Sequence, residues 1–77
     1  MERNREGKLR LLYVRDYLDL HRGAARAVTM AQILCTLGDK GIAADRRSIY
    51  DDLKLLEDYG MAIGRSGNRR YRRYYAK

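Results

Sequence analysis

The fold is decided by residues 29–60, TMAQILCTLGDKGIAADRRSIYDDLKLLEDYG, which carry the start and stop signals of two consecutive helices. Thr29 is a favourable N-cap, and Gln32 three residues later completes a capping box. Gly41 and the apolar residue after it are typical of a Schellman ending. The first of the two helices is therefore predicted over residues 29–40.

The second helix of this stretch is predicted over residues 45–59. Asp45 is a strong N-cap whose charge also suits a helix N-terminus, and Gly60 provides the stop. The apolar residues that we expect on the buried face are Ile49, Leu53 and Leu56, flanked by Leu55 and Tyr59. The opposite face carries Arg47, Tyr50, Asp51, Lys54 and Asp58, with Arg46 beside it in the first turn.

Upstream, a helix is predicted over residues 7–22, after a basic N-terminal tail at residues 1–7. One broad arc of this helix is apolar and consists of Leu9, Leu11, Tyr13, Val14, Tyr17, Leu18 and Leu20. Leu12 falls among the polar residues of the other side. Two interpretations of Leu12 stay open: a half-buried edge residue, or a second contact surface for a partner chain or a further domain.

Downstream, two short strands are predicted over residues 61–65 and 70–76, around a turn at Ser66, Gly67 and Asn68. Alternation in the second strand puts Tyr71, Arg73 and Tyr75 on one face and Arg70, Arg72 and Tyr74 on the other. Both faces are candidates for packing on the helices. We expect Tyr71 and Tyr75 to pack inward with Ile63.

The order of helix, loop, helix, short turn, helix and hairpin is that of a three-helix winged helix-turn-helix, a mainly α fold with a small β-hairpin. We expect residues 8–77 to form this one domain, with the wing at about residues 61–76. A chain of 77 residues has room for one small domain and for no deep substrate cavity.

The positive charge is concentrated at one end of the chain. The formal net charge is +7, and residues 61–77 hold six basic and no acidic side chains. A block of one sign is an electrostatic footprint for a polyanion, and the alternative is a solubilising surface. Because the block also has the alternation of a hairpin, we favour the first interpretation.

Several classes of protein and of site are disfavoured by composition. No run of about 18 apolar residues is present, and the charged start is unlike a secretory signal. The single cysteine, Cys35, excludes a disulfide or a cysteine-based zinc cluster within the chain and fits a reducing cytoplasm. The single histidine, His21, has no partner at catalytic spacing, and no phosphate-binding loop occurs. We therefore expect no enzyme, no metal and no cofactor.

Double-stranded DNA is the partner that this pattern favours. Arg46 and Arg47 stand at the helix end that meets base edges in this motif, and an arginine can bind guanine with two hydrogen bonds. Tyr50, between these arginines and Lys54, suits contact with bases and phosphates. The residues that we expect on phosphates or in the minor groove are Arg65, Arg69, Arg70 and Arg72 of the wing, with Lys8 or Arg10.

Two carboxylates of the 45–59 helix have alternative roles. Asp51 can accept a hydrogen bond from cytosine, or restrain Arg47 four residues earlier, which we favour. Asp52 falls within the apolar arc, where a carboxylate needs donors. We expect it to bond a backbone N–H or an arginine, and direct contact with DNA is the alternative.

Three segments, KLRLLY at residues 8–13, TMAQIL at residues 29–34 and GIAADRRSIYDDL at residues 41–53, resemble the N-terminal DNA-binding domain of WYL-domain transcriptional regulators. These are similar to the wider DeoR-type winged helix group. The resemblance covers about residues 8–76, and the Tyr74-Tyr75 pair is similar to the one that ends the family's wing. The wing is richer in arginine than the family pattern, and Arg73 replaces a small residue.

The resemblance implies a bacterial DNA-binding regulator with residues 45–59 as recognition helix. By that match the DNA-reading residues are Arg46, Arg47, Ser48, Tyr50 and Asp51. It also implies a separate ligand-sensing WYL domain in a longer chain, which residues 1–77 do not contain.

A rival function is a winged helix that binds proteins and has no DNA specificity. Its support is the acidic content of the third helix, namely Asp51, Asp52, Glu57 and Asp58. Recognition of RNA or single strands is less favoured, because aromatic platforms on an open sheet are missing. A homodimer through Leu12 of the first helix is possible, and we expect so small a patch to give a weak dimer or a monomer.

Overall fold

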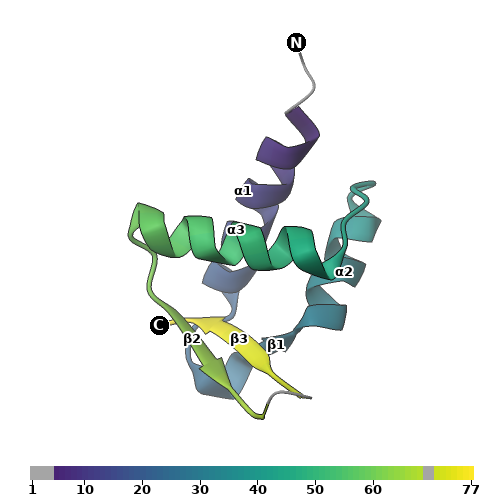
Figure 1. The fold of residues 1–77 in the computed structure, drawn as a ribbon. Coiled ribbons are helices and arrows are strands. Elements are labelled where there is room, and N and C mark those ends of the chain that lie inside the picture. Colours follow the sequence, from purple (N-terminus) through teal and green to yellow (C-terminus); the bar gives the residue numbers. More distant parts are fainter. Residues whose placement is uncertain (1–4, 69–70) are drawn as a thin grey trace.

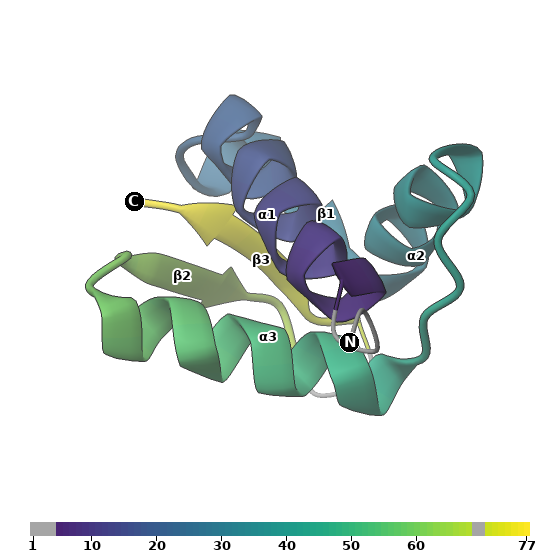
Figure 2. The same ribbon diagram turned by 90° about the horizontal axis from the view of Figure 1, so that it is seen from above.

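A computed structural model describes residues 5–68 and 71–77 of the chain. Three helices and a small antiparallel sheet follow one another in the predicted order (Figure 1), and the winged helix-turn-helix fold class is confirmed. The elements are α1 (Arg5–Leu20), the 3-10 turn η2 (Ala24–Arg26), β1 (Val28–Thr29), α2 (Met30–Asp39), α3 (Arg46–Tyr59), β2 (Ile63–Ser66) and β3 (Arg73–Ala76). In Figure 2, α3 lies along one side of the molecule, with α1 and α2 above it and the sheet beside α1.

Helix α2 begins and ends with the predicted caps. The Thr29 side chain accepts from the Gln32 backbone N–H at 3.1 Å, and the Gln32 side chain accepts from the Thr29 N–H at 2.8 Å. At the other end, the Ile42 N–H donates to the Leu37 carbonyl at 3.0 Å, which closes the Schellman motif. Gly41 has a φ of +77°, a left-handed conformation that favours glycine.

Helix α3 begins one residue after its cap, as predicted. The Asp45 carboxylate accepts from the Ser48 N–H at 2.9 Å, and these bonds with Ser48 lower the pKa of Asp45. The helix ends at Gly60, whose φ of +123° lets the Met61 N–H return to the Leu56 carbonyl at 2.9 Å. The cap therefore fixes where the exposed first turn of α3 starts.

Replacing Asp45 by alanine should lower the melting temperature by roughly 5 °C, because one N-terminal donor of α3 loses its acceptor. Thermal unfolding followed by circular dichroism measures the shift. Asp45→Asn keeps an acceptor at the same position and should retain most of the stability. Equal melting temperatures for the alanine variant and the parent chain would show that the cap does not hold the helix start.

Helix α1 is shifted toward the N-terminus relative to the prediction. It begins at Arg5, so the expected tail over residues 1–7 is wrong from Arg5 onward, and residues 1–4 lie outside the described part. It ends at Leu20 because the His21 ring bonds back to the Tyr17 carbonyl at 2.8 Å and the chain turns at Gly23. Leu20 is consequently 72% exposed, contrary to its assignment to the apolar arc, and Leu9 at that arc's edge is 37% exposed.

The sheet has a third strand that the sequence did not predict. Val28 precedes the predicted 29–40 helix and Thr29 is its predicted N-cap, yet both residues also pair with β3 in the order β1-β3-β2. Val28 lies opposite Tyr74 and Thr29 opposite Arg73. Two residues are too short for an alternation signal, so this strand is specified by its partner and not by its own sequence.

The wing packs through the face opposite to the expected one. Ile63 pairs with Ala76, which puts Tyr74 and Ala76 on the side of Ile63, and both are buried. The expectation that Tyr71 and Tyr75 pack inward is wrong for Tyr71, which is exposed. Tyr75 lies on the outer face and is half-buried, because its ring covers Gly64, where a Cβ would stand 2.2 Å from the ring.

The core lies where α1, α2, α3 and the sheet meet. Its fully buried side chains are Val14, Leu18, Ile33, Leu37, Ile49 and Leu53. Leu55 and Tyr59, expected beside the buried face of α3, are instead exposed. Within the described ranges, no helix is long and apolar enough to cross a membrane.

Candidate nucleic-acid interface

The outward face of α3 presents the predicted cations. Arg46, Arg47, Tyr50, Asp51 and Lys54 are all exposed. These positions share one side of the helix because the buried residues Ile49, Leu53 and Leu56 occupy the other. The helix therefore brings three cations and one tyrosine together on its solvent face.

Ser48 and Asp51 are the remaining residues of the predicted reading set. Ser48 is half-buried, and its backbone N–H is used by the Asp45 cap. Asp51 makes no ion pair with Arg47, so the favoured restraint of Arg47 by Asp51 is not formed. Arg47 thus extends from the first turn of α3 with no acidic side chain neutralising it.

A hollow of about 260 Å³ joins α3 to the wing and to the start of α2. Its lining residues are Thr29, Met30 and Ala31 of α2 and its cap, Arg46 and Tyr50 of α3, and Tyr71, Arg72, Arg73 and Tyr74 of the wing. We call this surface the α3–wing hollow. It gathers Arg46 of α3 with Arg72 and Arg73 of the wing, which are more than 20 positions away in sequence.

Tyr50 and Tyr74 connect the two walls of the α3–wing hollow. Tyr74 is buried, and its burial, followed by interaction with the neighbouring Tyr50, raises the pKa of its hydroxyl. The Tyr74 hydroxyl therefore keeps its proton at neutral pH and is a hydrogen-bond donor as well as an acceptor. Tyr50 remains 49% exposed, so its ring is available to a ligand in the hollow.

The wing arginines differ in how free they are. Arg65 binds the Glu57 carboxylate of α3 with two hydrogen bonds of 3.0 and 3.1 Å, and its guanidinium lies 5.8 Å from the centre of the Tyr74 ring. Arg65, which we expected to contact DNA, thus also links the wing to α3. Arg72 is exposed as expected, whereas Arg69 and Arg70 lie outside the described residues.

One cation of the hollow was missed by the sequence reasoning. Arg73 is exposed and lines the α3–wing hollow. Strand alternation alone had grouped it with Tyr71 and Tyr75 on the face expected to pack inward. The signal that could have found it is the absence of any acidic residue in residues 61–77 that could accompany Arg73 into a core.

The hydrogen bonds from Arg65 lower the pKa of Glu57. A carboxylate whose pKa is lower in the folded state stabilises the fold at pH values above its unfolded pKa, and this stabilisation is lost as the pH falls. We therefore expect Glu57→Gln to lose less stability than the parent between about pH 5 and pH 3. Since both side chains are over a third exposed, the difference at neutral pH should be only about 0.5 kcal/mol.

Urea unfolding at several pH values measures this difference. Asp16→Asn is a matched control, because Asp16 is an exposed carboxylate on α1 in a looser pair with the adjacent Arg15. Parallel stability curves for Glu57→Gln and the parent chain would contradict the role of the Arg65–Glu57 pair.

Arg10 is half-buried and pairs with a carboxylate of α3. Its guanidinium donates two hydrogen bonds to the Asp52 carboxylate, at 2.6 and 3.0 Å, between α1 and α3. The prediction that Asp52 bonds an arginine is confirmed, and the expected contact of Lys8 or Arg10 with phosphates stays a prediction. The pair joins α1 to α3, and the hydrogen bond to Asp52 raises the pKa of Arg10.

No protein-family model, no curated protein and no solved structure matches this chain. Among the described residues, no group of His, Cys, Asp or Glu side chains is placed to hold a metal ion. What the site offers is a tyrosine-lined hollow with excess positive charge, beside the first turn of an exposed helix.

Proposed function

We propose that this chain recognises double-stranded DNA by sequence, with α3 in the major groove and the wing on the backbone or in the minor groove. The α3–wing hollow carries this proposal, because it presents exposed cations of α3 and of the wing on one surface. A DNA duplex that holds α3 in its major groove would contact the wing at the same time. Neither element alone offers such a surface.

Base recognition would come from the first two turns of α3. The major groove displays a different pattern of donors and acceptors for each base pair, and an α-helix fits into it. Arg47 is exposed and unpaired in the described structure, which leaves its guanidinium free for the O6 and N7 atoms of a guanine. Tyr50 and Lys54 follow on the same face and would extend the contact to a neighbouring base or phosphate.

Affinity would come largely from phosphate contacts. Arg72 and Arg73 of the wing and Arg46 of α3 line the hollow and have no acidic partner there. Each neutralised phosphate releases condensed counterions, so such contacts make binding strongly dependent on salt. The wing would therefore set how tightly the chain binds, and α3 would set where it binds.

In the cell, the proposed role is that of the DNA-binding domain of a bacterial transcriptional regulator acting in the cytoplasm. The resemblance to the N-terminal domain of WYL-domain regulators supports this role through the sequence of residues 41–53. It also suggests that a ligand-sensing domain accompanies this one in the working protein.

The test is a binding titration with fluorescently labelled duplexes at several salt concentrations. We expect measurable binding to mixed-sequence duplex and a slope of log K against log salt of about −4, since about four cations are free at the interface. A preferred duplex should first be selected from a random library, and it should bind at least tenfold more tightly than a scrambled duplex. No duplex binding at low salt would contradict the proposal.

A protein-binding module without DNA specificity is the second candidate. The observation that favours it is a separate apolar surface at which Leu12, Leu55 and Tyr59 are exposed. The same titration separates the two candidates, because a protein-binding module would show neither the salt slope nor a preferred duplex.

A further inference from the structure

A second surface of the molecule, formed by α1 and the last turns of α3, is apolar at its centre. A groove of about 530 Å³ runs between the two helices, lined by Leu11 and Leu12 of α1, Leu55, Leu56 and Tyr59 of α3, with Arg15 and Asp58 as its charged residues. Leu12, Leu55 and Tyr59 are 45%, 53% and 81% exposed. Exposed apolar residues that are contiguous, and not scattered, mark a surface that another molecule covers.

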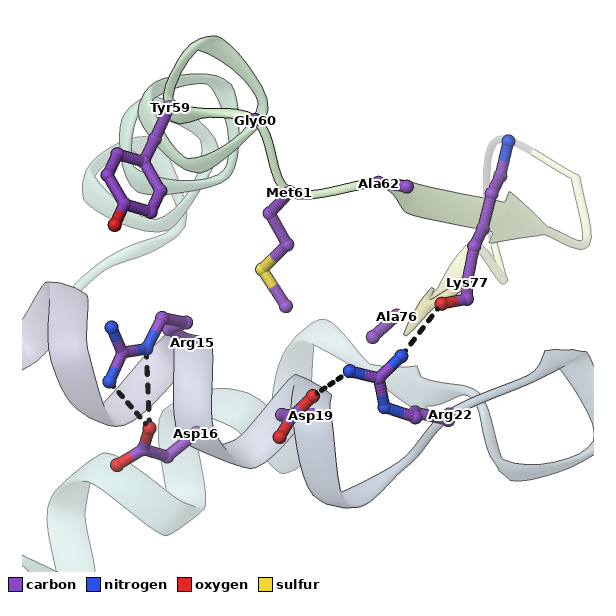
Figure 3. Close-up of a pocket in the computed structure, with 10 residues that line it drawn as sticks. All are labelled: Arg15, Asp16, Asp19, Arg22, Tyr59, Gly60, Met61, Ala62, Ala76 and Lys77. Atoms are coloured by element: carbon purple, nitrogen blue, oxygen red, sulfur yellow. Dashed lines mark hydrogen bonds and ion pairs between the residues drawn. The ribbon is translucent and has the colours of Figure 1, made fainter.

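A second hollow, of about 700 Å³, continues this groove toward the sheet. Figure 3 shows Arg15, Asp16 and Asp19 of α1, with Arg22 just after the helix, on one side of it and residues 59–62 on the other, with the Met61 side chain pointing into the space between them. Arg15 and Tyr59 line both the groove and the hollow, so the two form one continuous surface. We call it the α1–α3 surface.

The charge of the α1–α3 surface differs from that of the rest of the chain. Its acidic residues are Asp16, Asp19 and Asp58, and its basic residues are Arg15, Arg22 and Lys77, so the charges balance. Two copies of a chain with a net charge of +7 repel each other through their basic faces. The α1–α3 surface is one through which two copies can approach without this repulsion.

We propose that the α1–α3 surface binds a second copy of this chain in a two-fold symmetric dimer. In such a contact the same patch is used twice, so it must contain both halves of each interaction. Tyr59 stands between the groove and the second hollow and projects from the end of α3, so the surface presents a protruding ring beside hollows that can receive the ring of the other copy.

The charged residues of the groove can also pair between two copies related by a two-fold axis. Arg15 lies on α1 and Asp58 on α3, and Asp58 has no ion pair within the described part of the chain. Across a two-fold axis, Arg15 of one copy faces Asp58 of the other, and the pairing occurs twice. A second copy would supply a partner for Asp58 and a second carboxylate for Arg15, which already pairs loosely with Asp16, whereas an apolar peptide would leave Asp58 without a partner.

The strength of the dimer follows from its size. The accessible surface of the groove and the hollow, counted on both copies, is well below the roughly 1,200 Å² that stable interfaces bury, so we expect a dissociation constant on the order of 0.1 mM. Leu12 of α1 was predicted as a dimer contact from the sequence, whereas the α3 residues of this surface were not. The inference does not require DNA binding, because the α1–α3 surface shares no residue with the α3–wing hollow.

Sedimentation equilibrium of the whole chain, from roughly 10 μM to about 1 mM, tests the proposal. We expect a monomer–dimer equilibrium for the parent chain, and an association constant at least tenfold lower for Tyr59→Ala and for Leu12→Ser. Both side chains are substantially exposed, so these variants should fold, which circular dichroism checks. Tyr71→Ala is the matched control, because Tyr71 is an exposed tyrosine of the wing, and it should dimerise like the parent chain.

Charge reversal tests the orientation of the two copies. Arg15→Glu alone and Asp58→Arg alone should each weaken the dimer, whereas the double variant Arg15→Glu/Asp58→Arg should restore it to within about threefold of the parent. A monomer at about 1 mM would overturn the proposal and leave the surface to a different partner. A dimer that neither Tyr59→Ala nor Leu12→Ser weakens would also overturn it, as would a double variant that stays as weak as the single ones.

Discussion

Arg10→Met is expected to lower the free energy of unfolding by about 3–5 kcal/mol, because it leaves the Asp52 carboxylate without a cation between α1 and α3. Asp52 is 4% exposed, and both of its hydrogen bonds from Arg10 are lost together. Domains are typically stable by only about 5–15 kcal/mol, and a chain of this size belongs at the low end. Urea unfolding at 25 °C should therefore find the variant close to its midpoint without denaturant.

The double variant Arg10→Met/Asp52→Leu separates the loss of a pair from the loss of packing. Apolar side chains of similar volume often replace a buried ion pair at little or no cost, so the double variant should regain most of the lost stability. Its salt slope in duplex binding should equal that of the parent, since Arg10 does not face the α3–wing hollow. A loss below about 1 kcal/mol for Arg10→Met would show that the pair is not the support of α3 that its geometry indicates.

The second large effect concerns the separate contributions of the wing to affinity and of α3 to sequence preference. Replacing Arg72 and Arg73 together with alanine should flatten the slope of log K against log salt by about two units and weaken binding at 0.1 M salt about a hundredfold. The loss should be the same on a preferred duplex and on a scrambled one, because phosphates carry no sequence information.

Arg47→Ala should behave differently on the same two duplexes. It should change the salt slope by one unit or less, yet remove about 1–3 kcal/mol of preference at one or two base positions. Lys40→Ala is the matched control, because Lys40 lies at the opposite end of α2 from the hollow and should change neither quantity. If the wing variant lost its base preference while Arg47→Ala kept it, the wing and not α3 would be the reading element.

The elements that the sequence predicted well are those fixed by local signals. The caps at Thr29 and Asp45 and the stops at Gly41 and Gly60 act within a few residues, so α2 and α3 begin and end where expected. The exposed face of α3 follows from the same periodicity. The candidate site was predictable to the extent that it lies on this one helix.

The features that the sequence did not predict depend on residues far away along the chain. Strand β1 has two residues and is specified by β3, which lies more than 40 positions later. The inward face of the wing depends on the register in which Ile63 meets Ala76, and period-two alternation cannot supply a register. The partner of Asp52 is 42 positions away, so the kind of bond could be predicted but not that Arg10 makes it.

The sequence also missed how the wing and α3 share their charges. Arg65 looked like one more free wing cation until the structure paired it with Glu57, while Arg73, assigned to the packed face, lines the hollow. Both outcomes follow from the register of the wing, in which Arg65 lies opposite the buried Tyr74 and Arg73 falls on the other face. A charge block in the sequence thus gives the sign of a surface but not the cations that remain free.

Methylation interference on a selected duplex tests most directly whether α3 reads bases in the major groove. A methyl group on guanine N7 occupies the major groove edge that an arginine would bind. We expect methylation to block binding of the parent chain at one or more guanines, and Arg47→Ala to lose sensitivity at one or two of them while the others still interfere. Binding that is indifferent to N7 methylation at every guanine, or an identical pattern for Arg47→Ala and the parent chain, would contradict recognition of the major groove by this face of α3.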